Sequence, residues 1–169
     1  MSKVKLSPEN KSAFALIDFM SERDLQEVAE IETLCGLSRW GYDAYAAELF
    51  RPEAFMLVAR REEFAIENNM KLQGFIAARM AGRELHINNI AVRPESRRKK
   101  IGGRLLRAVL ELAAVRGAER AFLEVRASNI PAQELYLRNN FQIAGRRENY
   151  YRTPPEDALV MTASIFSAR

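Results

Sequence analysis

The sequence contains one cysteine and one histidine among its 169 residues. A single cysteine, Cys35, cannot form an internal disulfide, so nothing in the sequence argues for secretion. One cysteine and one histidine are too few for a dedicated zinc site, and we predict no metal centre. No apolar run approaches the roughly 18 residues that a membrane span requires, and the opening stretch, MSKVKLSPENKS, lacks an apolar signal core. These absences predict a cytoplasmic protein with no membrane partner.

Charge is only slightly unbalanced. The net charge is +4 and the pI about 9.4, which allows an anionic ligand without requiring one. One tight basic cluster, RRKK, covers residues 97–100. A general nucleic-acid binder more often carries several such clusters with interleaved aromatic residues. We therefore do not expect nucleic acid to be the partner.

The chain shows no repeats, low-complexity stretches or internal linkers. Its length suits one domain that buries a core without disulfides, and its 48% hydrophobic and 28% charged residues are typical of globular proteins. We predict a flexible N-terminus over residues 1–12 and a single domain over residues 13–169.

Hydrophobic patterning predicts the order of the elements. Strands are predicted over residues 13–20, 54–61, 71–80, 84–92, 120–125, 141–151 and 157–166. Helices are predicted after a capping box at Ser21 and Asp24, over residues 42–50, from near Gly102 to Gly117, and over residues 131–138. This order predicts an α/β protein with a mixed sheet and about four flanking helices.

The segment RRKKIGG, residues 97–103, connects the strand that ends at Val92 to the helix that opens near Gly102. A helix N-terminus exposes unpaired N–H groups and roughly half a positive charge, so it favours an anion. Glycines let the backbone approach phosphate oxygens, and arginine can bind phosphate through two hydrogen bonds. Spacing alone fits a phosphate cradle and a solvated basic turn equally well.

The stretch NIAVRPESRRKKIGGRLL resembles the acetyl-coenzyme A signature of the GNAT acetyltransferases. In that family an Arg or Gln is followed, three and five residues on, by Gly and then by Gly or Ala. Arg97 and Gly102 match, whereas Lys100 stands at the first glycine position. The resemblance continues as FLEVRASNIPAQELYLRNNFQIAGRRENYY and EDALVM, and it is similar to the RimI family, which acetylates the N-terminal alanine of a small-subunit ribosomal protein. It covers residues 85–163, and residues 13–84 follow the family only in pattern.

This resemblance implies a GNAT fold with a twisted, mostly antiparallel sheet, and acetyl-CoA as co-substrate. It implies that a strand end binds the pantetheine arm as a further strand, that the basic loop cradles the pyrophosphate, and that an asparagine lies near the coenzyme's sulfur. The residues that would do so are Ile90, Ala91, Val92, Arg98, Lys99, Lys100, Ile101, Gly102, Gly103 and Asn129.

Two departures from the family's glycines have different expected costs. Lysine at position 100 keeps the backbone N–H, so a cradle works without strain if its φ is negative. If its φ is positive, the residue strains the loop by about 1 kcal/mol. Asn140 replaces a second family glycine, and asparagine is the residue that best tolerates a left-handed conformation after glycine.

The resemblance also implies the catalytic residues. Glu124, in FLEV, would be a general base, directly or through water, and Tyr136 would donate a proton to the leaving thiolate. A backbone N–H near Ala91 or Val92 would polarise the thioester carbonyl. The alternatives are structural: Glu124 paired with Arg126 or Arg120, and Tyr136 as an aromatic anchor between helix and sheet. The resemblance thus makes Glu124 and Tyr136 the catalytic candidates.

Other chemically notable residues have weaker functional signals. His86 lies within a strand and is expected to be structural, and Cys35 is expected in the core. The aromatic group Trp40, Tyr42 and Tyr45 either lines an acceptor groove or packs, and the pair Tyr150 and Tyr151 is expected to border the peptide side.

Three alternatives remain open from the sequence. A GNAT enzyme could act on a small amine or on a lysine side chain, and LSRWG lacks the proline that commonly precedes this tryptophan in RimI. The chain could instead be a non-catalytic module that binds coenzyme A or nucleic acid.

The positive net charge does not favour a basic acceptor. A basic enzyme gains no general electrostatic steering toward a basic ribosomal protein, so local acidic groups such as Glu22, Asp43 or Glu48 would have to compensate.

Overall fold

A computed structural model of the chain describes residues 15–37, 40–61 and 72–166. The predicted flexible segment, residues 1–12, lies outside the described residues, as do the first two residues of the predicted first strand. In the part of the chain that the structure describes, no helix combines the length and the apolar character needed to cross a membrane.

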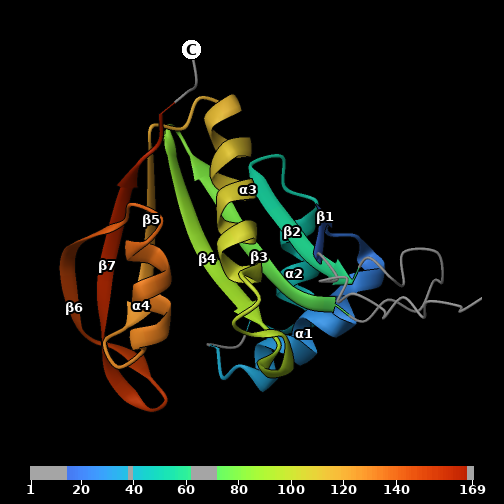
Figure 1. Ribbon diagram of the computed structural model, residues 1–169, viewed down its shortest axis with the longest axis horizontal. Helices are drawn as coiled ribbons and strands as arrows, with labels where there is room; N and C mark the ends of the chain where they lie inside the picture. The colour runs from blue at the N-terminus through green and yellow to red at the C-terminus, as the bar shows by residue number, and fades with distance from the viewer. Residues whose placement is uncertain (1–14, 38–39, 62–71, 167–169) are drawn as a thin grey trace, which may run out of the picture.

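Over the described residues the architecture is a mixed seven-stranded sheet with helices on both faces (Figure 1). The strands are β1 (Ala15–Phe19), β2 (Ala54–Arg61), β3 (Leu72–Ala81), β4 (Glu84–Val92), β5 (Arg120–Arg126), β6 (Gln142–Arg152) and β7 (Pro155–Ser164). The α-helices are α1 (Leu25–Leu34), α2 (Gly41–Leu49), α3 (Ile101–Val115) and α4 (Ile130–Leu137). The strand order is β1-β2-β3-β4-β5-β7-β6, and every neighbouring pair is antiparallel except β4 and β5. The predicted α/β class and the order of elements are confirmed.

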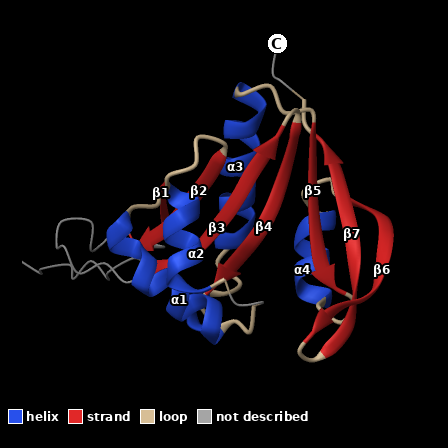
Figure 2. Ribbon diagram, turned by 180° about the vertical axis from the view of Figure 1, so that it is seen from behind, coloured by secondary structure: helices blue, strands red, loops and turns tan. Residues whose placement is uncertain are grey.

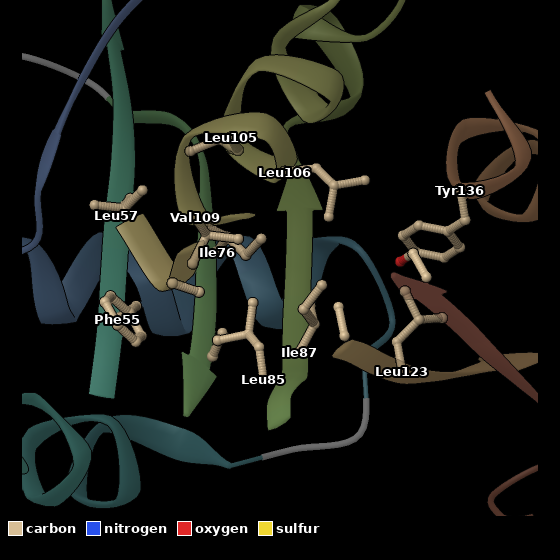
Figure 3. Close-up of a cluster of buried hydrophobic side chains, with 14 of the residues drawn as sticks. Phe55, Leu57, Ile76, Leu85, Ile87, Leu105, Leu106, Val109, Leu123 and Tyr136 are labelled. Atoms are coloured by element: carbon tan, nitrogen blue, oxygen red, sulfur yellow. The ribbon is translucent and has the colours of Figure 1, made fainter. Parts of the chain in front are cut away.

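The two faces of the sheet bury separate apolar clusters. Helices α1 and α2 cover one face, and α3 and α4 cover the other (Figure 2). On the α3 face, Leu105 and Val109 pack against Ile76 of β3 (Figure 3). On the opposite face, Val28 and Ile31 of α1 are fully buried. Removing such side chains from water is the main stabilising contribution to both layers.

Local sequence signals explain where the helices begin. The Asp24 carboxylate accepts hydrogen bonds from the Ser21 N–H and hydroxyl, which is the predicted capping box, although a short 3-10 turn (Glu22–Asp24) precedes α1. At α4, Asn129 Oδ1 accepts from the Ala132 N–H at 3.3 Å, and Pro131 occupies the first turn.

Strands β4 and β5 pair along half of their length and then separate. Their last paired residues are Ile87 and Leu123. On the β3 side the register skips Asn88, which marks a β-bulge at the same level and bends β4. Both views show the two strands diverging toward the end of the sheet at which α1 lies (Figures 1 and 2). The end of β4 therefore has an edge without a strand partner among the described residues.

Candidate active site

A cavity of about 400 Å³ lies where β4 and β5 diverge. Its walls come from both strands, from α4, from the segment after α1 and from β6. The lining residues are Cys35, Gly36, Leu37, Trp40, Ile87, Asn88, Asn89, Ile90, Leu123, Glu124, Val125, Arg126, Asn129, Ala132, Tyr136, Tyr150 and Tyr151. The divergence of the two strands thus brings together residues that lie more than 100 positions apart in the sequence.

The free edge of β4 presents backbone groups to this region. Arg93 donates its N–H to the Gln73 carbonyl of β3 at 2.8 Å. Because hydrogen-bonding direction alternates along a strand, Ala91 also bonds toward β3, and Ile90 and Val92 turn their N–H and C=O groups to the open edge. The Val92 carbonyl there accepts from Arg97 Nε at 3.2 Å. An extended pantetheine arm fits such an edge as a further strand would.

The basic loop before α3 contains two residues in the left-handed conformation. Both Arg98 and Lys100 have a φ of 61°, and Lys100 is the N-cap of α3. Lys100 therefore follows the strained of the two predicted alternatives, at a cost of about 1 kcal/mol. Left-handed residues in such loops turn successive N–H groups into concave sites for anions. Asn140 has a φ of 66°, the conformation that its replacement of glycine requires.

Gly102 also has a packing role that could not be predicted from the sequence. A Cβ atom at Gly102 would lie 3.2 Å from Leu135 Cδ2, and one at Gly103 would lie 3.7 Å from Leu135 Cδ1. Leu135 belongs to α4, so Gly102 lets the first turn of α3 approach α4 closely, whereas a Cβ at Gly103 would make an ordinary contact. The coenzyme-binding candidates of α3 and the end of α4 are therefore packed together.

The carboxylate of Glu124 lies at the β5 wall of the cavity. Its side chain is 30% exposed, and Oε1 lies 3.3 Å from a guanidinium nitrogen of Arg147 on β6. If Glu124 had only a structural role, Arg126 or Arg120 was its expected partner. Arg126 instead pairs with Glu156 at 3.1 Å. One carboxylate oxygen of Glu124 is thus engaged by a cation that the sequence analysis did not identify.

Tyr136 projects from α4 toward Ile87 and Leu123, at the point where the strands separate (Figure 3). The residue is 5% exposed, and its ring packs against Phe141 with centroids 5.9 Å apart. Burial, with a smaller contribution from Tyr151, raises the pKa of the Tyr136 phenol well above its usual value. The phenol therefore keeps its proton at neutral pH and can act as a donor in the cavity.

The remaining aromatic candidates divide between wall and core. Trp40 lines the cavity and packs on Tyr45 with ring centroids 5.3 Å apart, whereas Tyr45 itself is fully buried. Tyr150 and Tyr151 line this cavity and also an adjoining one of about 750 Å³. The adjoining cavity is bordered by the segment after α1 and by the end of β6, and it shares five lining residues with the first: Gly36, Leu37, Arg126, Tyr150 and Tyr151.

Three other candidates differ in their relation to the cavity. His86 stacks on Phe122 with centroids 5.6 Å apart and lies outside the cavity lining, which fits its predicted structural role. Cys35 was expected in the core, but it is half-buried at the end of α1 and lines the cavity. Cys35 is the C-cap of α1, and its thiol donates to the Val92 carbonyl at 3.4 Å, which places it at the edge of the core beside the cavity.

None of the three acidic residues proposed to compensate the basic charge lines either cavity. Glu22 and Asp43 are exposed elsewhere, and Glu48 is buried in an ion pair with Arg79. The acidic residue that sequence reasoning missed is Glu32, which is 1% exposed. Its position four residues after buried Val28, on the apolar stripe of α1, was an available signal.

Comparison with known proteins gives a consistent result. Residues 25–141 match the Acetyltransferase (GNAT) family. A Bacillus subtilis (strain 168) relative, named as a candidate ribosomal protein bS18-alanine N-acetyltransferase, is 38% identical over 152 residues, which are 89% of this chain and 96% of the relative. The ribosomal protein bS18-alanine N-acetyltransferase of Escherichia coli (strain K12) is 30% identical over 88% of this chain and 97% of its own length.

A solved structure agrees with these matches. The crystal structure of the ribosomal-protein-S18-alanine N-acetyltransferase from Escherichia coli superposes with a TM-score of 0.77 at 28% identity, covering 92% of this chain and 96% of that one. The open β4 edge, the left-handed loop at the start of α3 and the cavity between the diverging strands fit acetyl-CoA as the acetyl donor. The chain belongs to the GNAT acetyltransferase family, and it is an acetyl-CoA-dependent N-acetyltransferase similar to RimI.

Proposed function

We propose that the enzyme acetylates the N-terminal α-amine of a protein, and that the N-terminal alanine of ribosomal protein bS18 is the first acceptor to test. The observation that carries this proposal is the cavity between β4 and β5, in which the Glu124 carboxylate and the Tyr136 phenol line walls from different elements. The adjoining cavity, which Tyr150 and Tyr151 also line, offers room for the residues that follow the amine. The names of the bacterial relatives support this acceptor.

The coenzyme would be held mainly by backbone groups. Ile90 offers its N–H and C=O groups along the open edge of β4, and Val92 offers its N–H, because its carbonyl already accepts from Arg97 and Cys35. The amides of residues 98–103 would bind the pyrophosphate. Ala91 would contribute through its place in the strand, since its own polar groups face β3. Asn129 lines the cavity and uses Oδ1 to cap α4, which leaves its amide nitrogen available to the coenzyme.

Glu124 would remove a proton from the acceptor amine, directly or through water. Arg147 engages one carboxylate oxygen at 3.3 Å, and the second oxygen remains for the amine. The Val92 N–H, on the open edge of β4, would stabilise the negative charge that develops on the carbonyl oxygen. Glu124 lines the cavity, and Val92 lies on β4 two residues beyond Ile90, which also lines it.

Tyr136 would donate a hydrogen bond or a proton to the departing thiolate. A thiol ordinarily has a pKa of roughly 8.5, below that of a phenol. Burial raises the pKa of the Tyr136 phenol, and the same apolar surroundings raise the basicity of a thiolate that forms beside it. The phenol is thus kept protonated until the leaving group develops charge.

The test is a kinetic comparison with an alanine-initiated peptide from the bS18 N-terminus. Wild-type enzyme should release thiol and yield peptide acetylated at the α-amine, identified by mass spectrometry. Glu124→Gln and Tyr136→Phe should each lower kcat by about 100-fold or more, because general acid–base groups typically contribute that much. Acetyl-CoA affinity, measured by calorimetry, should stay within about twofold.

The control acceptor is the same peptide with a blocked N-terminus and an internal lysine. Faster turnover of this peptide than of the alanine-initiated one would contradict the proposed acceptor. Near-wild-type rates in both variants would remove the catalytic assignment of Glu124 and Tyr136.

A further inference from the structure

A chain of hydrogen bonds leads from a buried carboxylate to the wall of the cavity. Glu32, near the end of α1, accepts from the Tyr45 hydroxyl at 2.9 Å through Oε1. The Tyr45 oxygen in turn accepts from Asn89 Nδ2 at 2.8 Å. Asn89 lines the cavity, whereas Glu32 and Tyr45 lie behind it. The reaction steps described above use none of these groups.

The direction of every hydrogen bond in this chain is determined. A carboxylate only accepts, so Tyr45 must donate its single hydroxyl proton to Glu32. Burial, followed by the charge of Glu32, raises the pKa of the Tyr45 phenol, which therefore retains that proton. The phenol oxygen can then only accept from the next group, so the Asn89 amide turns its NH₂ toward Tyr45. The amide oxygen of Asn89 consequently points away from Tyr45.

The first member of the chain is itself held in place. Glu32 accepts the N–H groups of Trp40 at 2.7 Å and Gly41 at 3.0 Å, where α2 begins. Amides at a helix N-terminus stabilise a carboxylate through hydrogen bonds and the helix dipole. Glu32 is therefore bound on both oxygens and cannot turn to accommodate a different Tyr45 or Asn89 orientation.

The amide oxygen of Asn89 is available to a ligand. Among the described residues no group donates a hydrogen bond to Asn89 Oδ1. In the same part of the chain, the fully buried side-chain oxygen that lacks a partner is Gln73 Oε1, so Asn89 Oδ1 is not sealed in the core. Since Asn89 lines the cavity, its free oxygen is open to that space. Asn89 belongs to β4 and Glu124 to β5, so the two acceptors stand on opposite strands of the divergence.

We propose that Asn89 Oδ1 binds one N–H of the acceptor's α-amine, and that Tyr45 and Glu32 are positioning residues that fix the orientation of this amide. This inference rests on the proposed function. A neutral primary amine has two N–H groups and one lone pair. With one N–H on Asn89 and the other on Glu124, the lone pair is the group left to attack the thioester carbonyl. Glu124 takes its proton as the C–N bond forms and the C–S bond breaks, and the N–H on Asn89 remains in the amide product.

The experiment compares steady-state kinetics of wild type, Asn89→Ala and Tyr45→Phe with the alanine-initiated peptide. Loss of one hydrogen bond should raise the acceptor KM about five- to tenfold in Asn89→Ala, with the acetyl-CoA KM within about twofold. Tyr45→Phe should change the acceptor KM in the same direction although Tyr45 does not line the cavity, because the Asn89 amide is then free to turn. Circular dichroism and thermal melting test whether each variant is folded.

The matched control is Glu48→Gln, because Glu48 is 3% exposed, belongs to the same helix as Tyr45 and pairs with Arg79 away from the cavity. It should lower the melting temperature and leave the acceptor KM unchanged. A second probe is a peptide that begins with N-methylalanine and so has one fewer N–H. Wild type should prefer the primary amine, and Asn89→Ala should reduce that preference.

The outcomes separate the two proposals. If wild type acetylates neither the alanine-initiated peptide nor the N-methylalanine peptide, the proposed function fails and this inference fails with it. If wild type acetylates the alanine-initiated peptide but Asn89→Ala and Tyr45→Phe keep its acceptor KM, this inference alone is overturned. An equal rise in acceptor KM in Glu48→Gln would also overturn it, because the effect would then follow general destabilisation.

Discussion

Replacing Lys100 by glycine should stabilise the protein. Lys100 has a φ of 61° and a ψ of 12°, a left-handed conformation that costs a residue with a side chain about 1–2 kcal/mol. Its positive charge at the N-terminus of α3 opposes the helix dipole by about 0.3–1 kcal/mol. Glycine removes both costs but adds about 0.4–1 kcal/mol of unfolded-state entropy. The free energy of unfolding should therefore rise by about 1 kcal/mol, and Tm by about 2–4 °C.

Two matched variants separate strain from charge. Lys100→Ala removes the charge and keeps the strain, so it should recover only the dipole contribution of about 0.3–1 kcal/mol. Lys99→Gly removes the same charge at a neighbour whose φ is not positive, so charge and entropy should nearly cancel, with a net change of about 0.5 kcal/mol or less. Reversible urea unfolding, followed by circular dichroism, measures all three.

The same variants report on the coenzyme site. An exposed ammonium–phosphate contact is worth about 1 kcal/mol or less, so the Kd for acetyl-CoA should change by no more than about fivefold in Lys100→Gly. If Lys100→Gly is no more stable than Lys99→Gly, Lys100 does not strain the loop, and the reasoning from its φ is refuted. A much larger gain in affinity would show that lysine obstructs the cradle.

Two further predictions concern stability. A Cβ at Gly74 would lie 2.5 Å from the Ala91 carbonyl oxygen, so Gly74→Ala should displace the end of β4. The free energy of unfolding, measured by urea titration, should fall by about 1–3 kcal/mol. An unchanged midpoint would contradict this. Burial alone would raise the pKa of Asp24, but hydrogen bonds from Arg60 and Ser21 outweigh it and lower the pKa. Because the pKa of Asp24 is lower in the folded than in the unfolded state, its carboxylate stabilises the protein at pH values above the unfolded pKa, and this contribution is lost as the pH falls. The difference in stability between wild type and Asp24→Asn should therefore shrink below about pH 4 in thermal melts. A constant difference would refute this.

Much of the candidate site followed from local patterns. The basic loop, the strand that ends at Val92 and the helix after it are adjacent in sequence, and helix periodicity and glycine placement are local signals. The resemblance to the GNAT family supplied Glu124 and Tyr136 as catalytic candidates, and both line the cavity, which leaves their roles to be tested. The partner of Glu124 could not be predicted in the same way, because Arg147 reaches it from another strand.

By itself, the sequence determined the order of the helices and strands and the capping box at Ser21 and Asp24. These features depend on neighbours within a few residues, through periodicity, side-chain caps and backbone sterics. Only the tertiary structure decided where β4 and β5 separate, that Lys100 adopts the left-handed conformation, and that Glu32 orients Asn89 through Tyr45. Such features depend on which distant residues meet, because strand pairing and buried hydrogen bonds join segments that no local pattern relates.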